Sequence, residues 1–391
     1  MRRPPRTLAS ARNHAKSVPA MTFPSLLPEG LRDRLPPEAE ALARVRRAVL
    51  STAELNGYAR VEPPLVEFET TLVGRLKSSR ATDLLRVVDP VSQRTLALRP
   101  DITAQVGRIA STRLAHWPRP LRLCYAGQVL KVRGSQLRPE REMCQAGCEI
   151  IGSGAVPAVI EAIRVALDAL GQAGADGLSV DLTLPDLVPL LARGPMPVAD
   201  EEALIAKLDG KDAGALAALG ASAYLPLIEA AGPVEAALSR LAAIDAGGQL
   251  ASRIEGVRAI AAAVAGRATV TLDPTERHGF EYQSWIGFSI FADGVRGEVG
   301  RGGSYSILHP DGHEEAAVGF SLYLDPLVGA GRAAERRDRV FLPLDTPADI
   351  ARKLHAEGRA TLAALGNGDD PRALGCTHIW ADRALHPLSQ D

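Results

Sequence analysis

The chain lacks several features that would assign it to a function class at once. Its 391 residues include only four cysteines and 4% aromatic residues, and its formal net charge is −1. A nearly balanced charge gives no global attraction to nucleic acid or to an anionic membrane surface. No apolar run approaches the roughly 20 residues that span a bilayer. The composition therefore argues against RNA binding as the main activity and predicts no membrane association.

The four cysteines do not indicate a metal centre. Cys144 and Cys148 are four residues apart, but no second cysteine pair and no nearby histidine completes a tetrahedral zinc set. We therefore expect no metal and no cofactor. We interpret all four cysteines, including Cys124 and Cys376, as small apolar side chains of a cytoplasmic protein.

The first 20 residues carry five lysines or arginines and no acid. They lack the continuous apolar segment of a secretory signal, although an organelle transit peptide has a similar composition. We favour a disordered tail over residues 1–20, or a start codon placed upstream of a true beginning at Met21.

The first part of the chain, residues 21–175, has the pattern of a core of helices and strands. A helix with an apolar stripe of 3.6-residue period precedes an extended segment that contains Pro63 and Pro64. Two prolines exclude a central strand, so we expect this segment at a sheet edge or an interface. The stripe consists of Leu42, Val45, Val49 and Ala53. Four further elements are predicted, namely hairpins around Asp89-Pro90 and over 123–152, and helices over 101–114 and 156–171.

The rest of the chain divides into three parts. Residues 176–266 are rich in alanine and leucine and predict a helical insertion. Strand patterns return over residues 267–330, which end in a predicted helix with the sequence EAAVGFSLYLDPLVGA. Residues 331–391 predict a short α/β element of one strand, one helix (PADIARKLHAEGRATLAAL) and one short strand. Taken together, the two core parts favour an α+β fold, a mostly antiparallel sheet with helices on one face.

Two polar side chains interrupt the apolar strand that ends the hairpin over residues 123–152. Gln145 and Glu149 are four residues apart and therefore point to the same face of a strand. A buried carboxylate is costly unless a positive group or several donors meet it. Glu149 is thus expected to pair either with a protein cation such as Lys131 or with a cationic ligand.

Other polar groups occur next to turns. Asp101 and Thr103 stand at the start of a predicted helix, where Asp101 either caps the helix or faces a ligand ammonium. Tyr305 follows a glycine-rich turn that has neither the strand–GxGxxG–helix setting of a dinucleotide site nor the Lys-Ser/Thr end of a P-loop. A further polar segment contains Arg277, His278, Glu281 and Tyr282. From the residues alone, these features predict a site for a small polar ligand on an antiparallel sheet.

Six segments resemble, in their order along the chain, the motifs of class II aminoacyl-tRNA synthetases and of histidyl-tRNA synthetase in particular. GYARVEPPLVEF is similar to the dimer-forming motif 1, LRPDITAQVGR to a Leu-Arg-Pro-Glu-x-Thr segment, and the hairpin over 123–152 to motif 2. RHGFEY resembles the histidine-specific Arg-Gly-x-Asp-Tyr motif, GGSY a Gly-Gly-Arg-Tyr turn, and AVGFSLYLDPLV stands where motif 3 belongs. The resemblance covers residues 24–330 and implies the class II catalytic fold, with self-association through the motif 1 region.

The sequence departs from these motifs where the synthetases bind ATP. Lys131 stands in place of an arginine that holds phosphate, and Arg133 in place of an ATP-contacting glutamate. Asp325-Pro326 replaces a Glu-Arg pair of motif 3. Lysine has no planar bidentate fork and proline has no charge, so the resemblance implies that adenylation is lost and that the chain has no catalytic residues. Only 63 residues follow Val328, too few for the anticodon domain, and no tRNA partner is expected.

The amino-acid side of the synthetase site is retained in part. The family's histidine-specific arginine aligns with His278, and the neighbouring Arg277 substitutes for it only if the loop shifts. The second tyrosine of that motif is Gln283. The resemblance implies histidine contacts at Asp101, Thr103, Gln145, Glu149, Tyr282 and Tyr305, with Lys131, Arg277 and His278 as further candidates.

A synthetase fold that keeps the amino-acid pocket and loses the ATP residues resembles the family of ATP phosphoribosyltransferase regulatory subunits. That resemblance implies a non-catalytic subunit that joins a short catalytic subunit in a hetero-octamer. It also implies a role in the first step of histidine biosynthesis and in feedback regulation by histidine. Two alternatives remain open, a divergent class II ligase that activates histidine or another small acid with ATP, and a protein-interaction paralogue in translation control.

Overall fold

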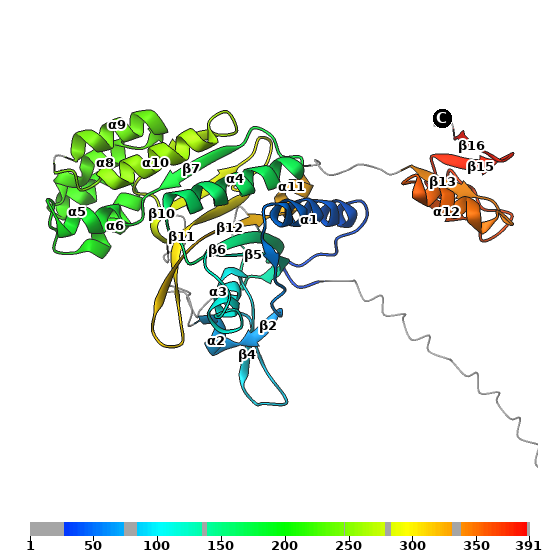
Figure 1. Cartoon of the computed structure of the whole chain (residues 1–391), viewed down its shortest axis with the longest axis horizontal. Helices are drawn as coiled ribbons and strands as arrows, with labels where there is room; N and C mark the ends of the chain where they lie inside the picture. Colours follow the sequence, from blue (N-terminus) through cyan, green and yellow to red (C-terminus); the bar gives the residue numbers. More distant parts are fainter. Residues whose placement is uncertain are drawn as a thin grey trace, which may run out of the picture.

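The computed structural model describes residues 27–73, 84–134, 139–245, 247–277, 283–330 and 338–388. These parts of the chain contain three β-sheets, the largest of which has nine strands (Figure 1). The predictions for residues 1–20, His278 and Tyr282 lie outside the described residues.

The nine-stranded sheet combines strands from both predicted core parts. Its order is β1-β5-β6-β12-β11-β10-β7-β9-β8, and all neighbours run antiparallel except the pairs β1–β5 and β7–β9. The strand β1 lies at the sheet edge, as the two prolines that follow it predict. The nine strands are β1 (Ala59–Arg60), β5 (Leu121–Leu130), β6 (Glu142–Ile151), β7 (Ser179–Thr183), β8 (Gly232–Pro233), β9 (Thr269–Leu272), β10 (Gln283–Phe291), β11 (Gly300–Leu308) and β12 (Glu314–Tyr323). This sheet confirms the predicted α+β fold.

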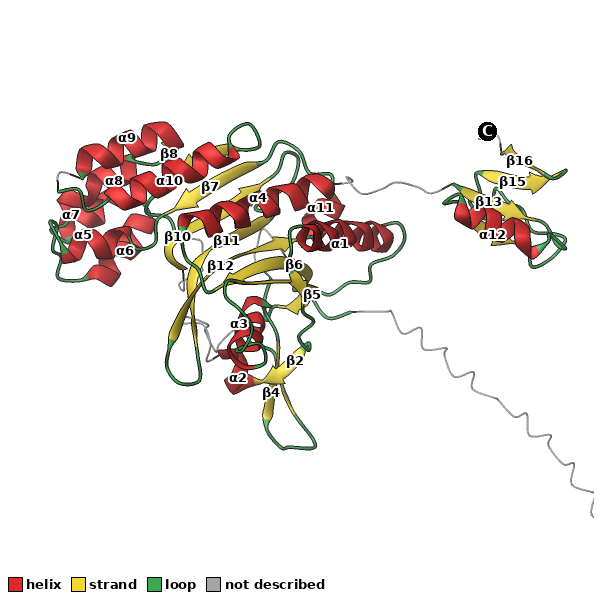
Figure 2. Cartoon of the chain, in the orientation of Figure 1, coloured by secondary structure: helices red, strands yellow, loops and turns green. Residues whose placement is uncertain are grey.

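Two long helices cover one face of the sheet (Figure 2). The helices α1 (Glu38–Leu55) and α4 (Val156–Gln172) contact each other, and both pack against β6. All four residues of the predicted α1 stripe are buried in this layer, as is the apolar face of α4. The opposite face is contacted by α3 (Thr103–Thr112), which packs against β6 and β11. The candidate site lies on this second face.

A three-stranded sheet of order β2-β4-β3 contains the hairpin that was expected around Asp89-Pro90. The carboxylate of Asp89 accepts hydrogen bonds from the backbone N–H groups of Val91 and Ser92, which closes the turn. The elements of this part are β2 (Val66–Phe68), α2 (Glu69–Val73), β3 (Arg86–Val88) and β4 (Thr95–Leu98).

The helix predicted from EAAVGFSLYLDPLVGA is wrong over most of its length. Residues Glu314–Tyr323 form β12, and only the short α11 (Asp325–Gly329) is helical. The strand lies between β6 and β11 and is buried on both faces, so its apolar residues form a continuous run. Such a run has no two-residue alternation that would distinguish a strand from a buried helix.

The segment expected to be a helical insertion, residues 176–266, is helical only from Leu187 onward. It begins with β7, which pairs with β10 and β9 of the main sheet, and it also contains the short β8. The strand β7 has five residues and therefore gives a weak pattern inside an alanine-rich segment. The helices of residues 176–266 are α5 (Leu187–Arg193), α6 (Glu201–Asp209), α7 (Ala213–Ala218), η2 (Ser222–Tyr224), α8 (Leu225–Glu229), α9 (Val234–Ile244) and α10 (Ala251–Val264).

The C-terminal part forms its own sheet of order β14-β13-β15-β16. The predicted helix there was too long, because α12 ends at Ala356 and Gly358 follows in a left-handed conformation with a φ of 79°. The next residues form β14, which pairs in parallel with β13. The elements are β13 (Arg339–Leu342), α12 (Ala348–Ala356), β14 (Ala360–Ala363), β15 (His378–Ala381) and β16 (Ala384–Pro387).

The helices of the described residues were also compared with the length and hydropathy that a bilayer requires. None of them is both long and apolar enough to cross a membrane.

Candidate functional site

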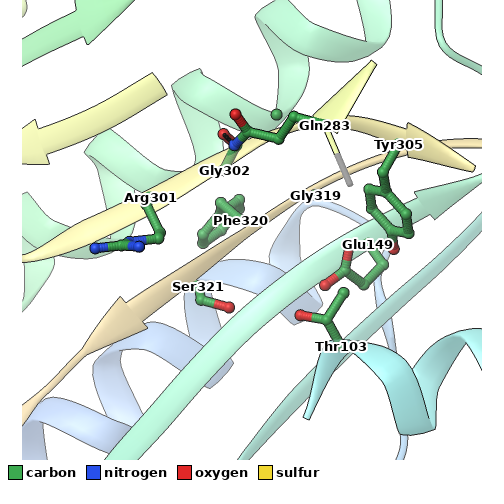
Figure 3. A pocket seen from close by; sticks show the side chains of 10 residues that line it. Thr103, Glu149, Gln283, Arg301, Gly302, Tyr305, Gly319, Phe320 and Ser321 are labelled. Atoms are coloured by element: carbon green, nitrogen blue, oxygen red, sulfur yellow. Dashed lines mark hydrogen bonds between the residues drawn. The ribbon is translucent and has the colours of Figure 1, made fainter. Parts of the chain in front are cut away.

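A pocket opens on the face of the sheet that α3 contacts. Strand register places Glu149 of β6 opposite Gly319 of β12, and Gly319 opposite Gly303 of β11. A Cβ atom at Gly319 would overlap Oε2 of Glu149, so a glycine is needed there to leave space for the carboxyl group. The pocket has an empty volume of ≈ 270 Å³, including the part open to solvent. It is lined by Thr103, Glu149, Gln283, Arg301, Gly302, Gly303, Tyr305, Gly319, Phe320 and Ser321 (Figure 3).

The carboxyl group of Glu149 is held by two tyrosines inside the protein. The Glu149 residue is only 1% exposed. The hydroxyl of Tyr305 donates to Oε2 at 2.7 Å, and the hydroxyl of Tyr125 donates to Oε1 at 3.1 Å. Burial raises the pKa of Glu149 to about 8, and the charge of Asp101 acts in the same direction, while the tyrosine hydrogen bonds oppose both. In this environment most of the Glu149 carboxyl groups carry a proton at pH 7.

A hydrogen-bond network joins the other predicted residues to this carboxyl group. The hydroxyl of Tyr125 lies 3.2 Å from Oγ1 of Thr103 and 3.0 Å from Oγ of Ser321. The amide nitrogen of Gln145 donates to Oγ of Ser321 and to Oδ2 of Asp101, both at 2.6 Å. Four residues that the sequence singled out, from α3, its preceding loop and β6, therefore meet in one connected site.

Asp101 directly precedes Ile102, the N-cap residue of α3. Its Oδ1 accepts a hydrogen bond from the backbone N–H of Thr103 at 2.7 Å. The neighbouring N–H of Ile102 donates to Oε1 of Gln145 at 3.0 Å, which fixes the Gln145 side chain against the helix start. Asp101 thus binds the first N–H of α3 from the residue before the N-cap, and its contact with a ligand ammonium stays a prediction.

Two of the further candidates lie elsewhere. Lys131 is exposed and follows Leu123, the cross-strand partner of Glu149, by eight residues along the chain, which corresponds to about 27 Å in an extended strand. The structure therefore does not place Lys131 as the partner of Glu149. Arg277 lines a second pocket, next to α5 and α6, where its backbone N–H donates to Asp209 at 2.8 Å.

The motif 3 position has a structural role here. Oδ1 of Asp325 accepts hydrogen bonds from Nε and Nη2 of Arg34 at 3.0 and 2.8 Å, and its Oδ2 accepts one from the backbone N–H of Cys144 at 2.6 Å. This carboxylate joins the segment before α1 to the start of β6. Pro326 stands in the first turn of α11, a position where proline needs no hydrogen-bond donor. These residues stabilise the fold at the place where the synthetase motif would contact ATP.

Sequence reasoning missed three residues that the structure brings to the site, namely Tyr125, Ser321 and Arg301. All three lie in one cross-strand row with Gly147, since the register pairs Tyr125 with Gly147, Gly147 with Ser321, and Ser321 with Arg301. Tyr125 could have been found by folding the 123–152 hairpin about its loop. The other two required the order of distant strands.

The chain was compared with protein families and with known proteins. The family model described as "Histidyl-tRNA synthetase" matches residues 30–327. The "ATP phosphoribosyltransferase regulatory subunit" of Rhodospirillum centenum is 42% identical over 375 residues, which cover 93% of this chain and 96% of the relative. The protein of the same description from Paramagnetospirillum magneticum is 42% identical over 365 residues, covering 90% and 95%.

Solved structures show the same fold. The crystal structure of an ATP phosphoribosyltransferase regulatory subunit/histidyl-tRNA synthetase from Bacillus halodurans C has a TM-score of 0.76, with 23% identity, and covers 90% of this chain and 96% of its own. Histidyl-tRNA synthetase from Nostoc sp. PCC 7120 has a TM-score of 0.75, with 14% identity, covering 91% and 90%. At these identities the likeness concerns the fold alone.

The fold and the matched family model define a class II aminoacyl-tRNA synthetase-like protein of the histidyl type. Within this class, the identities to curated relatives over nearly their full length are decisive. The chain belongs to the family of ATP phosphoribosyltransferase regulatory subunits, which are non-catalytic proteins of histidine biosynthesis. The family resemblance and the regulatory role expected from the sequence are both confirmed, and the ligase alternative is set aside.

Proposed function

We propose that histidine binds in the pocket at Glu149 and that its binding regulates a short-form ATP phosphoribosyltransferase catalytic subunit joined to this chain. The observation that carries the proposal is the buried carboxyl group of Glu149. It lines the pocket and accepts hydrogen bonds from two tyrosine hydroxyls. Burying a carboxyl group in this way costs free energy that a purely structural role does not require. A ligand that shares a proton with the carboxyl group gives this burial a function.

The imidazole of histidine fits this requirement. Its ordinary pKa of about 6.5 is close to the pKa of about 8 at Glu149, so one proton can be shared between the two groups near neutral pH. Tyr305 and Tyr125 fix the position of the carboxyl oxygens by hydrogen bonds. Affinity should therefore be greatest between pH 6.5 and 8, where the free partners together carry the single proton that the complex needs.

The remaining predicted contacts orient the amino-acid part. Asp101 would attract the ammonium group, and Thr103 and Gln145 would direct it through the network that they form with Ser321. Tyr282 and His278 lie outside the described residues and stay proposed histidine contacts. Lys131 and Arg277 lie outside the lining of the Glu149 pocket and would reach a ligand only in a rearranged state.

Regulation then requires a coupling free energy between the histidine pocket and the subunit interface. Couplings of this type are typically about 1–3 kcal/mol. The central position of β6 and β12 in a nine-stranded sheet supports transmission, because their other face packs against α1 and α4. We further propose self-association through the motif 1 region, a hetero-octamer with the catalytic subunit, no tRNA partner and a cytoplasmic location.

The proposal is tested by calorimetry of histidine binding in the presence of the catalytic subunit. Glu149→Gln keeps the size of the side chain but can no longer share a proton with the ligand, and we expect it to weaken histidine binding about tenfold or more. Glu255→Gln, an exposed change on α10, is the matched control and should bind histidine like the wild type. Equal affinities of all three proteins would overturn the assignment of the pocket.

A further inference from the structure

We propose that Arg301 binds the carboxylate of the ligand and makes this pocket selective for a free amino acid over its amide. The inference rests on the proposed function and names the group that determines specificity. Among the ten residues that line the pocket, all within the described part of the chain, Arg301 is the one Lys, Arg or His. It lies on β11, whereas the family's histidine-specific arginine aligns with His278, which is outside the described residues.

Arg301 and Glu149 lie at opposite ends of the pocket (Figure 3). Their strands are two steps apart in the sheet, and Arg301 is two residues along β11 from Gly303, which pairs through Gly319 with Glu149. With about 4.8 Å between strands and 3.4 Å per residue, their Cα atoms are about 12 Å apart. Figure 3 shows the Arg301 side chain directed away from Glu149, so the space between the guanidinium and the carboxyl group is left open for a ligand.

The guanidinium group is held in place before any ligand arrives. Its Nε donates to Oε2 of Glu298 at 3.1 Å, and its Nη2 forms an ion pair with Oε1 of the same carboxylate. The group also lies over the ring of Tyr323, 5.9 Å from the ring centre. Ser289 donates to Glu298 at 3.2 Å and fixes the carboxylate in turn. Because the plane of Arg301 is fixed, little side-chain entropy is lost when a ligand binds.

The chemistry of the two ends suits a zwitterion. Arg301 presents only N–H donors, five in total, and its Nε and Nη2 contact Glu298. A ligand carboxylate accepts such donors in a bidentate arrangement, whereas an amide presents an NH₂ group that cannot accept them. The negative charge of Glu298 cancels much of the long-range attraction, so recognition here depends on hydrogen-bond geometry at short range. At the Arg301 end, the pocket therefore distinguishes –COO⁻ from –CONH₂. At the Glu149 end, it binds the imidazole.

The experiment measures the ratio of affinities for L-histidine and L-histidinamide by calorimetry, using the full chain with its catalytic subunit. The wild type should prefer histidine by about tenfold or more. Arg301→Gln should lose this preference through weaker histidine binding, with histidinamide affinity nearly unchanged. Arg301→Lys keeps the charge without the fork and should show an intermediate ratio, which provides a second test if the Gln variant folds poorly.

The matched control is Arg296→Gln, an exposed arginine on the turn between β10 and β11, which should keep the wild-type ratio. If Arg301→Gln binds histidine and histidinamide with the wild-type ratio, the role of Arg301 is refuted and the proposed function stands. If Arg301→Gln weakens both ligands equally, Arg301 has a structural role only, and the inference is also refuted. If the wild type binds no histidine while it still activates the catalytic subunit, the proposed function and the inference fail together.

Discussion

Replacing Glu149 by glutamine should change how the stability of the chain depends on pH. In the folded protein the pKa of Glu149 is raised to about 8 by burial, whereas the unfolded chain has the usual value of 4.5. Between these two values the folded state holds a proton that the unfolded state has released. The free energy of unfolding of the wild type should therefore fall as pH rises from about 4.5 to about 8. Glutamine does not titrate, so Glu149→Gln removes this part of the pH dependence.

The magnitude follows from the distance between the two pKa values. At 1.36 kcal/mol per pH unit, the full cost of ionising Glu149 in the fold is about 5 kcal/mol, to be read as an order of magnitude. Near pH 5 the wild type and the variant should unfold at similar temperatures, because the folded carboxyl group is then neutral and can donate a hydrogen bond as an amide does. Near pH 8.5 the variant should be more stable by up to several kcal/mol.

Scanning calorimetry of the chain without histidine between pH 5 and 9 measures this effect, with Glu255→Gln as the control. The expected result is a difference in melting temperature between Glu149→Gln and the wild type that grows from pH 5 to about pH 8 and then levels off. Parallel pH profiles for the two proteins would contradict a raised pKa of Glu149. They would mean that Glu149 keeps its usual pKa and is therefore solvated or paired in solution.

Three further outcomes are expected. Gly319→Ala places a Cβ atom against Glu149 and should abolish measurable histidine binding and lower the melting temperature. Gly329→Ala, with no heavy atom near the added Cβ, should do neither. Calorimetry measures both quantities, and an equal effect of the two changes would contradict the prediction. Arg34→Met leaves Asp325 without its cation and should lower the free energy of unfolding by about 1–3 kcal/mol in denaturant titrations, since both side chains are mostly buried, and no change would contradict this contact. The wild-type chain should show no histidine-dependent exchange of pyrophosphate into ATP, and robust exchange would contradict the loss of adenylation.

The parts of the fold that sequence predicted well are those with a clear period or a clear break. The stripe of α1, the edge position of β1 and the turn at Asp89-Pro90 each follow from local chemistry, and the structure confirms them. The prediction for β12 was wrong because a strand buried on both faces has no alternation of apolar and polar residues. In the C-terminal sheet, β13 and β15 were predicted, whereas β14 fell inside the predicted helix and β16 was not predicted, because four residues are too few to establish a pattern.

The sequence predicted those site residues whose positions follow from the pattern of a single strand. Gln145 and Glu149 were found because a spacing of four places both on one face of β6. Arg301 and Ser321 were not found because they reach the site through the order of β6, β12 and β11, which depends on long-range pairing. Lys131 was considered as the partner of Glu149 from charge alone, and the register places it far along the strand.

The most direct test of the central claim is an inhibition titration of the assembled enzyme with histidine. Catalytic subunit joined to the wild-type chain, to Glu149→Gln or to Glu255→Gln is assayed at increasing histidine, each normalised to its own activity without histidine. Half-inhibition should require at least about tenfold more histidine with Glu149→Gln, whereas Glu255→Gln should match the wild type. Identical inhibition curves for all three assemblies would contradict this expectation.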